Sequence, residues 1–256
     1  MITEGLKSLP GVQFFHMSGN RISEKGAESL LSQISKSAKL IDLSSNNVGK
    51  LGVDHICASV TLRECKIETL NLEDNKLGDK ISVKLFEALQ NNGTLKKLNM
   101  SKNFLTDAIA DSIKALLQKN YSIQELYLHW NLFKTQGGIK IFQGILENEI
   151  LMVLDFSWNS IGNGVPSVVP EILEVFKTNE RLIHLDLSNN NFSREESRQI
   201  AEGLANNHTI YGFHFVGNYG HVDSRGFLII NENEERDLSE MHVSHRINSN
   251  IFFKNL

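Results

Sequence analysis

The sequence has few cysteines and no long apolar run. Cys57 and Cys65 are the only cysteines among 256 residues, too few for the disulfide framework of a small secreted protein. The opening MITEGLKSLP lacks the pattern of a secretory leader, and no apolar run approaches the roughly 18 residues that a membrane helix needs. These absences favour a cytoplasmic protein without a membrane span.

The sequence also has little net charge and none of the short motifs that bind nucleotides or metals. Lysine and arginine number 26 against 30 aspartates and glutamates, a net charge of −4, which argues against general binding to nucleic acid or to a membrane surface. Walker and GxGxxG sequences are absent, as are HxxxH and CxxC spacings. We therefore expect no cofactor, no metal and no nucleic-acid partner.

One sequence frame recurs eight times along the chain. In the stretch RLIHLDLSNNNF, which begins at Arg181, three leucines precede Asn190 and Phe192 follows it. The leucines fit a short strand with one buried face, and the asparagine amide fits the turn that ends the strand, where it can bond to unpaired backbone groups. The asparagines of the eight copies, which lie 26 to 31 residues apart, are Asn20, Asn46, Asn75, Asn103, Asn131, Asn159, Asn190 and Asn218.

The hydrophobic period changes after each asparagine. Leu85 and Leu89 follow Asn75 by 10 and 14 residues, and the same spacing of four recurs in other copies, which predicts a helix. A repeat of this length in this frame is the signature of leucine-rich repeats. We therefore predict an α/β fold, a right-handed leucine-rich-repeat solenoid or horseshoe with a parallel β-sheet on the concave face and helices on the convex face.

The repeats cover residues 12–218, and both ends of the chain depart from them. Residues 1–11 carry half a repeat and are predicted to cap the first strand. Residues 219–256 are predicted to form a C-terminal cap followed by an acidic, polar tail. One repeat is longer than its neighbours because of an insertion that contains Pro166 and Pro170, each of which can occupy a first helical turn.

Repeats of about 28 residues, with full helices and polar ends such as NNGT and NNHT, resemble the ribonuclease-inhibitor class of leucine-rich repeats. That class includes ribonuclease inhibitor, the Ran GTPase-activating protein, the sensor arrays of NOD-like receptors and ciliary proteins. The resemblance implies the fold and leaves the function open. The stretch HFVGNYGHVDSRGFL is also similar to the ends of leucine-rich-repeat proteins of ciliated unicellular eukaryotes, which implies a cilium, an axoneme or the cytoskeleton.

The only two tryptophans of the chain occupy equivalent positions in adjacent repeats. Residues two, four and six positions before each asparagine are expected to project from the concave face, with the residue directly before it at the rim. Trp130 and Trp158 fill this rim position, and tryptophan and tyrosine dominate interface hot spots. The predicted partner-binding residues are Tyr127, His129, Trp130, Asp155, Trp158, His184, Asp186 and His214. The last four repeats place acidic groups and no lysine or arginine at the concave positions, so we expect the partner to present basic groups.

Other interpretations of these residues stay open. The tryptophans can instead stack as a structural lid over the turn. Asp186 and His214 are expected to be cross-strand neighbours with Ser157 and Ser188 nearby, but a catalytic serine needs a water-excluding pocket that an open sheet does not supply. His184 could join Asp186 and His214 around a metal, yet no ligand spacing supports this. We therefore expect no enzymatic activity.

The sequence favours a non-enzymatic protein-protein interaction module or scaffold that binds a protein partner on its concave face. One alternative is a GTPase regulator resembling the Ran GTPase-activating protein, whose long acidic tail is approached only by residues 231–240. Another is a structural component of a ciliary or cytoskeletal assembly. The partner, the pathway and the oligomeric state cannot be read from the sequence.

Overall fold

The structure, a computed structural model, describes residues 11–230 of the chain. The N-terminal cap predicted at residues 1–11 lies outside this range except for its last residue. The acidic tail predicted beyond residue 230 lies outside it as well. None of the helices within the described range is long and apolar enough to cross a membrane.

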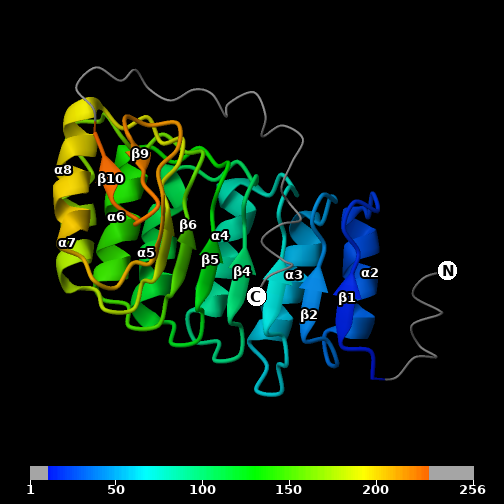
Figure 1. Ribbon diagram of the computed structural model, residues 1–256. Helices are drawn as coiled ribbons and strands as arrows, with labels where there is room; N and C mark the ends of the chain where they lie inside the picture. The colour runs from blue at the N-terminus through cyan, green and yellow to red at the C-terminus, as the bar shows by residue number, and fades with distance from the viewer. Residues whose placement is uncertain (1–10, 231–256) are drawn as a thin grey trace.

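Eight short strands form one parallel sheet in chain order (Figure 1). Neighbouring strands pair at equivalent repeat positions, so that Leu98 lies opposite Leu126, and Leu126 opposite Leu154. The strands are β1 (Phe14–His16), β2 (Leu40–Asp42), β3 (Thr69–Asn71), β4 (Lys97–Asn99), β5 (Glu125–Tyr127), β6 (Val153–Asp155), β7 (His184–Asp186) and β8 (Gly212–His214). The parallel sheet that the repeat frame predicts is confirmed.

A helix follows each of the first seven strands, and the helices together cover one face of the sheet (Figure 1). They are α2 (Glu24–Ile34), α3 (Gly49–Val60), α4 (Gly78–Leu89), α5 (Ala110–Lys119) with the preceding 3-10 turn η1 (Asp107–Ile109), α6 (Thr135–Leu146), α7 (Val169–Thr178) and α8 (Arg194–Ala205). Pro170 lies in the first turn of α7, as its sequence position suggests. Pro166 does not begin a helix. It lies in the preceding loop, after a cis peptide bond from Val165.

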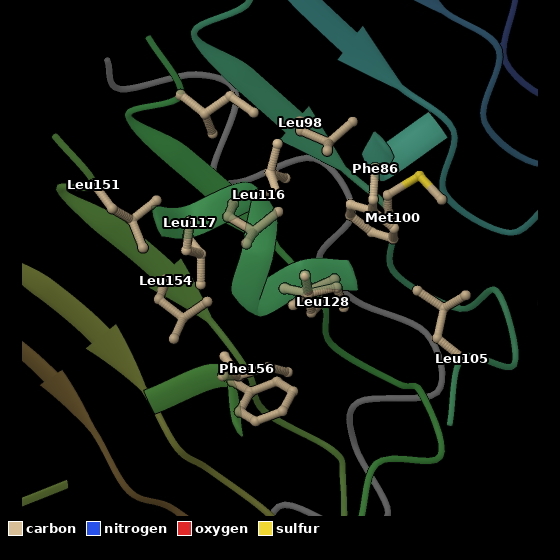
Figure 2. Close-up of a cluster of buried hydrophobic side chains, with 14 of the residues drawn as sticks. Phe86, Leu98, Met100, Leu105, Leu116, Leu117, Leu128, Leu151, Leu154 and Phe156 are labelled. Carbon is tan, nitrogen blue, oxygen red and sulfur yellow. The ribbon is translucent and has the colours of Figure 1, made fainter. Parts of the chain in front are cut away.

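The space between the sheet and the helices is filled by apolar side chains (Figure 2). The central residue of each strand and the second residue after it point inward because side chains alternate along a strand. Leu98 and Met100 are fully buried in this way, as are Leu126 and Leu128 one repeat later. The leucine frame of the sequence is thus the inner face of the sheet.

A ladder of asparagines runs along the edge where the strands end. The side chain of Asn131 accepts from the backbone N–H groups of Asn103 and Leu105 at 3.0 Å each, and donates to the carbonyls of Leu128 and Met100. Equivalent bonds link the other inner repeats. Asn20 in the first repeat is exposed, and its side-chain amide donates to the carbonyl of Ser18 in its own turn. These amides satisfy backbone groups that would otherwise be buried without a partner.

A second asparagine ladder, which the repeat frame did not include, supports the opposite edge of the sheet. Its members lie between each helix and the next strand and are Asn92, Asn120, Asn148, Asn179 and Asn207. Asn120 donates to the carbonyl of Leu89 at 2.7 Å and accepts from the N–H of Ile123 at 2.8 Å. Both ends of strands β4 to β8 are therefore tied to the preceding repeat.

The last repeat replaces its helix with a small hairpin. Strands β9 (His221–Val222) and β10 (Leu228–Ile229) pair antiparallel after Asn218, and β10 contacts α8. Leu228 is buried. The hairpin thus extends the core beyond the last parallel strand.

Candidate functional site

Trp130 and Trp158 stack on each other at the edge where β5 and β6 end. Their ring centroids are 4.3 Å apart, with 13° between the planes. The backbone N–H of Trp130 donates to Ser157, and that of Trp158 donates to Ser188, so the sheet fixes the spacing of the rings. Both side chains are half-buried. The stacking geometry taken alone is compatible with both a binding surface and a structural lid.

The backbone at both tryptophans is left-handed, a feature that sequence reasoning missed. Both residues have φ of 52°, and every residue directly before a ladder asparagine has positive φ. The residues at this position are Gly19, Ser45, Asp74, Lys102, Trp130, Trp158, Asn189 and Gly217. Side chains other than glycine and asparagine are disfavoured there, by roughly 1–2 kcal/mol. Two adjacent tryptophans are therefore the least expected occupants of this position.

Two exposed apolar side chains occur just after the rim position of the repeat. Phe104 and Leu132 directly follow their ladder asparagines, and each is 54% exposed. They belong to adjacent repeats, because the N–H of Leu132 donates to the carbonyl of Leu105 at 2.7 Å. Trp130 and Leu132 flank the same asparagine. We call Trp130, Trp158, Phe104 and Leu132 the aromatic rim.

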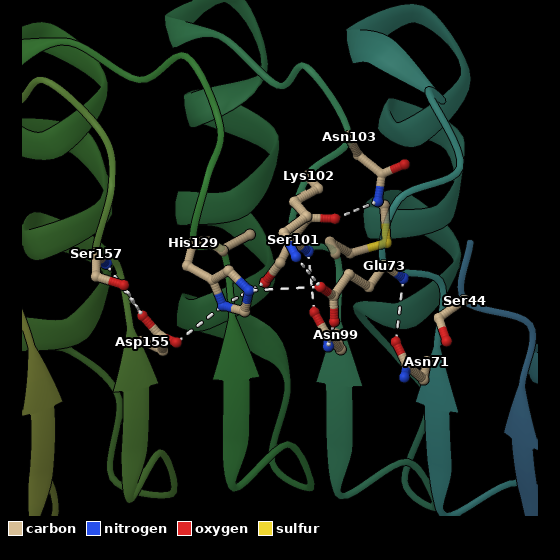
Figure 3. A network of polar contacts seen from close by, with 12 residues as sticks. Ser44, Asn71, Glu73, Asn99, Ser101, Lys102, Asn103, His129, Asp155 and Ser157 are labelled. Carbon is tan, nitrogen blue, oxygen red and sulfur yellow. Dashed lines mark hydrogen bonds and ion pairs between the residues drawn. The ribbon is translucent and has the colours of Figure 1, made fainter. Parts of the chain in front are cut away.

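A chain of alternating charges crosses the concave face below this rim (Figure 3). His129 lies between two carboxylates, with Nδ1 2.8 Å from Asp155 and Nε2 3.7 Å from Glu73. Lys102 binds the same Glu73 oxygen at 2.7 Å. The hydroxyl of Ser101 lies 2.9 Å from Nδ1 of His129. Four strands, β3 to β6, are joined by these contacts.

The charges of this network stabilise one another. Burial alone would lower the pKa of His129, but the carboxylates of Asp155 and Glu73 raise it to about 9. Burial would raise the pKa of Glu73, but hydrogen bonds from His129 and Lys102 lower it to about 2. The pKa of Asp155 is also lowered, because the charge of His129 outweighs burial. At neutral pH the network holds two cations and two anions.

The network was only half visible in the sequence. His129 and Asp155 were predicted as site residues, whereas Glu73 was not. Glu73 and His129 both lie two positions before their ladder asparagine, where Ser101 and Ser157 show the commoner residue type. The replacement of serine by Glu73 and His129 at this position was the sequence feature that could have indicated the network.

Asp186 lies next to this network without joining it. It pairs in register with Asp155 across β6 and β7, and its carboxylate accepts from the N–H of Ser188 at 2.8 Å. Burial and then the negative charge of Asp155 raise the pKa of Asp186 to about 7. Within residues 11–230 the structure shows no ion pair for Asp186. The C-terminal half of the concave face therefore carries one uncompensated carboxyl group.

His184 and His214, two of the predicted site residues, contact each other. The rings of His184 and His214 are 4.9 Å apart, in adjacent strands. Burial lowers the pKa of both rings, and the neighbouring His214 lowers that of His184 further. Both are therefore neutral near pH 7 and do not offset the charge of Asp186.

Tyr127 is less accessible than its concave position suggests. Its side chain is only 7% exposed, because Lys97 lies over the ring, 4.9 Å from the centroid. The tyrosine hydroxyl donates to Glu125 at 2.7 Å, and Glu125 also binds Lys97 at 2.6 Å. Burial and the bond to Glu125 raise the tyrosine pKa. Tyr127 therefore supports the concave surface and offers little area for contact.

Of the residues considered for catalysis, Asp186 and His214 pair in register on adjacent strands, as the repeat frame predicts. The hydroxyl of Ser157 donates to Asp155 at 2.7 Å. Among the described residues, no group of three or more histidine, cysteine, aspartate or glutamate side chains is arranged to hold a metal ion.

The long insertion after Trp158 is anchored to α8, the helix of the following repeat. Glu196, part of the capping box of α8, accepts from the N–H of Asn163 and from the hydroxyl of Ser167, both at 2.8 Å. Between these anchors, Val165 is almost fully exposed. The loop that follows Trp158 therefore has an exposed apolar residue, Val165, between its two anchors.

Comparisons with known proteins agree with the repeat architecture. Two family models that describe leucine-rich repeats match residues 64–85 and 181–207. A structure of leiomodin-1 actin-binding site 2 is 24% identical, with 59% of this chain and 87% of that chain covered and a TM-score of 0.51. A tropomodulin C-terminal domain of Caenorhabditis elegans is 13% identical, covering 71% and 91% with a TM-score of 0.44. A search of curated proteins finds no match.

The likeness to leiomodin-1 at this identity shows the fold alone. Together with the eight parallel strands and the alternating helices, it defines the chain as a leucine-rich-repeat protein. Such open solenoids typically bind other proteins on their extended surfaces.

Proposed function

We propose that the chain is a non-enzymatic module that binds a protein partner across the aromatic rim and the concave face of β5 to β8. The observation that carries this proposal is the stacked pair Trp130–Trp158 in left-handed backbone. The turn imposes this backbone on all eight repeats, so the unusual feature is the choice of two bulky tryptophans where glycine or asparagine fits with less strain. Half-buried aromatic side chains beside exposed Phe104 and Leu132 also match the composition of interface hot spots.

The charge of the site supports a basic partner surface. Lys97 and Lys102 are each bound to a glutamate, and His129 is balanced by Asp155 and Glu73. Among the acidic strand residues of β5 to β8, Asp186 is the one for which the described chain shows no ion pair. A partner lysine or arginine near Asp186 would favour its ionised form.

Several partners are worth testing directly. The leiomodin-1 structure is named for an actin-binding site, so actin is one. Small GTPases test the proposal of a GTPase regulator, with GTP hydrolysis as the readout. A ciliary or cytoskeletal role remains a proposal that localisation of the tagged protein would test.

The experiment is a crosslinking pull-down from the native source with quantitative mass spectrometry. It compares the intact protein with the double variant Trp130→Asn/Trp158→Asn. Tyr121→Asn is the matched control, because Tyr121 is an exposed aromatic residue that precedes β5 at the opposite edge of the sheet. Selective loss of a partner in the tryptophan variant supports the proposal. Equal capture by all three proteins contradicts it.

A further inference from the structure

The described chain ends at the edge of the sheet that carries the aromatic rim. Strand β9 begins three residues after Asn218 of the ladder, and β10 runs back along it. Ile230 consequently lies against Gly220, where an added Cβ would be 2.4 Å from the isoleucine Cδ1. Figure 1 shows this hairpin at the end of the solenoid, next to α8. Ile230, the last described residue, therefore lies at the same edge of the sheet as the aromatic rim, three repeats from Trp130 and two from Trp158.

The sequence beyond this point has two parts of opposite character. Residues 231–240, NENEERDLSE, contain five acidic residues and one arginine. Residues 241–256, MHVSHRINSNIFFKNL, contain seven apolar residues with Arg246 and Lys254, and no acidic residue. The final sixteen residues are thus apolar and basic.

The concave face of β5 to β8 has the complementary character. Its charged strand residues are Glu125, Asp155 and Asp186, and the strands carry no lysine or arginine. The first two carboxylates are paired within the repeats, whereas Asp186 is not. The aromatic rim adjoins this acidic surface. An apolar and basic segment therefore fits the site in both charge and hydrophobicity.

We propose that residues 241–256 of this chain bind across the aromatic rim and the Asp155–Asp186 surface. Phe252 and Phe253 cover the tryptophan pair, and a cation of the segment neutralises Asp186. This inference rests on the proposed function, since it places the segment on the partner-binding face. A partner must then displace the segment, which makes the C-terminal residues an autoinhibitory element.

The linking residues are long enough for this arrangement. A random-coil linker of eleven residues, the number from 231 to 241, would have a root-mean-square span of about 18 Å. The distance from β8 to β5 is three strand spacings, about 14 Å. Tethering at this scale gives an effective concentration in the millimolar range, so a weak contact suffices. The acidic residues 231–240 are repelled by the acidic face and act as the spacer.

The two tryptophans provide a direct readout, because they are the only ones in the chain. Acrylamide quenching of their emission is measured on the full chain and on Phe252→Ser/Phe253→Ser. The matched control is Leu62→Ser/Tyr121→Ser, which alters two exposed apolar residues at the opposite edge of the sheet. We expect quenching to rise about twofold in the phenylalanine variant, because a millimolar effective concentration keeps the tryptophans covered in the full chain. The control should match the full chain.

A synthetic peptide of residues 241–256 completes the test. Added to the phenylalanine variant, it should restore the lower quenching, and both Asp186→Asn and high salt should weaken this effect. Quenching that is unchanged in the phenylalanine variant overturns the inference, as does a peptide without effect. Quenching that depends on protein concentration overturns it too, since the segment of a second copy would then be the occupant.

Partner capture separates this inference from the proposed function. If both hold, Phe252→Ser/Phe253→Ser captures more partner than the intact chain, and the tryptophan variant captures less. If only the segment inference fails, the phenylalanine variant captures the same amount. If only the proposed function fails, quenching responds to the phenylalanines while no partner is lost from the tryptophan variant.

Discussion

Replacement of Trp130 and Trp158 by asparagine, alone and together, distinguishes a binding surface from a structural lid. Asn189 occupies the equivalent position with φ of 56°, so asparagine suits the left-handed backbone that the turn requires. The change removes the stacked rings and leaves the backbone hydrogen bonds of the sheet in place. Its effect on stability therefore measures what the rings contribute to the fold.

The expected effect is modest. The stacking of two aromatic rings contributes about 0.5–1.5 kcal/mol. Burial of a half-buried ring contributes about 1–2 kcal/mol, roughly half the value for a fully buried large side chain. Asparagine in left-handed backbone offsets about 1 kcal/mol of this loss. Each single variant should lower the free energy of unfolding by about 1–2 kcal/mol, with a coupling of about 1 kcal/mol in the double variant.

The assay is urea unfolding followed by far-ultraviolet circular dichroism, because the substitutions remove the fluorescent residues. A loss of about 4 kcal/mol in a single variant, the level of a truncated core aromatic, would refute the reasoning and show that the tryptophans are a lid. A coupling near zero would show that the ring stack contributes nothing in solution.

Three further substitutions test the polar groups of the structure. The native pKa of Asp186 is about 7, so its ionisation opposes folding as the pH rises from about 4 to 7. Asp186→Asn should therefore raise the free energy of unfolding by about 1–3 kcal/mol near pH 8 and leave it unchanged near pH 4. Urea unfolding at these two pH values measures the difference. His129→Ala leaves Glu73 and Asp155 without their shared cation and should cost about 2–4 kcal/mol near pH 7. Since the native pKa of His129 is about 9, the loss of stability caused by His129→Ala should be smaller above pH 9 than near pH 7. An equal loss at pH 7 and above pH 9 would contradict the ion pairs. Asn103→Ala removes a fully buried ladder amide and should cost about 2–4 kcal/mol, seen as a lower urea midpoint.

The sequence was sufficient to predict the strands and their order. Leu126 and Leu128 alternate with other residues before the ladder asparagine Asn131. This alternation determines which face of the strand is buried, and the asparagine marks the end of the strand. Because every repeat copies it, neighbouring repeats stack at equivalent positions. The adjacency of Trp130 and Trp158 follows from the same regularity.

The conformations of long side chains could not be predicted in this way. Tyr127 occupies a concave position, yet it is buried because Lys97 and Glu125 close over its ring. Glu73 and His129 meet although one strand separates them. Such contacts depend on side-chain rotamers and on neighbouring residues in three repeats at once. The leucine and asparagine pattern of one repeat does not specify either of them.

The most direct test of the central claim is site-specific photocrosslinking to the captured partner. A benzophenone amino acid replaces Leu132 of the aromatic rim in one protein and Leu62 in another. Both leucines are exposed, but Leu62 lies between α3 and β3, at the opposite edge of the sheet. A partner bound at the rim will crosslink at position 132 and not at position 62. Crosslinking at position 62 alone, or equal yields at both, would contradict binding at the aromatic rim.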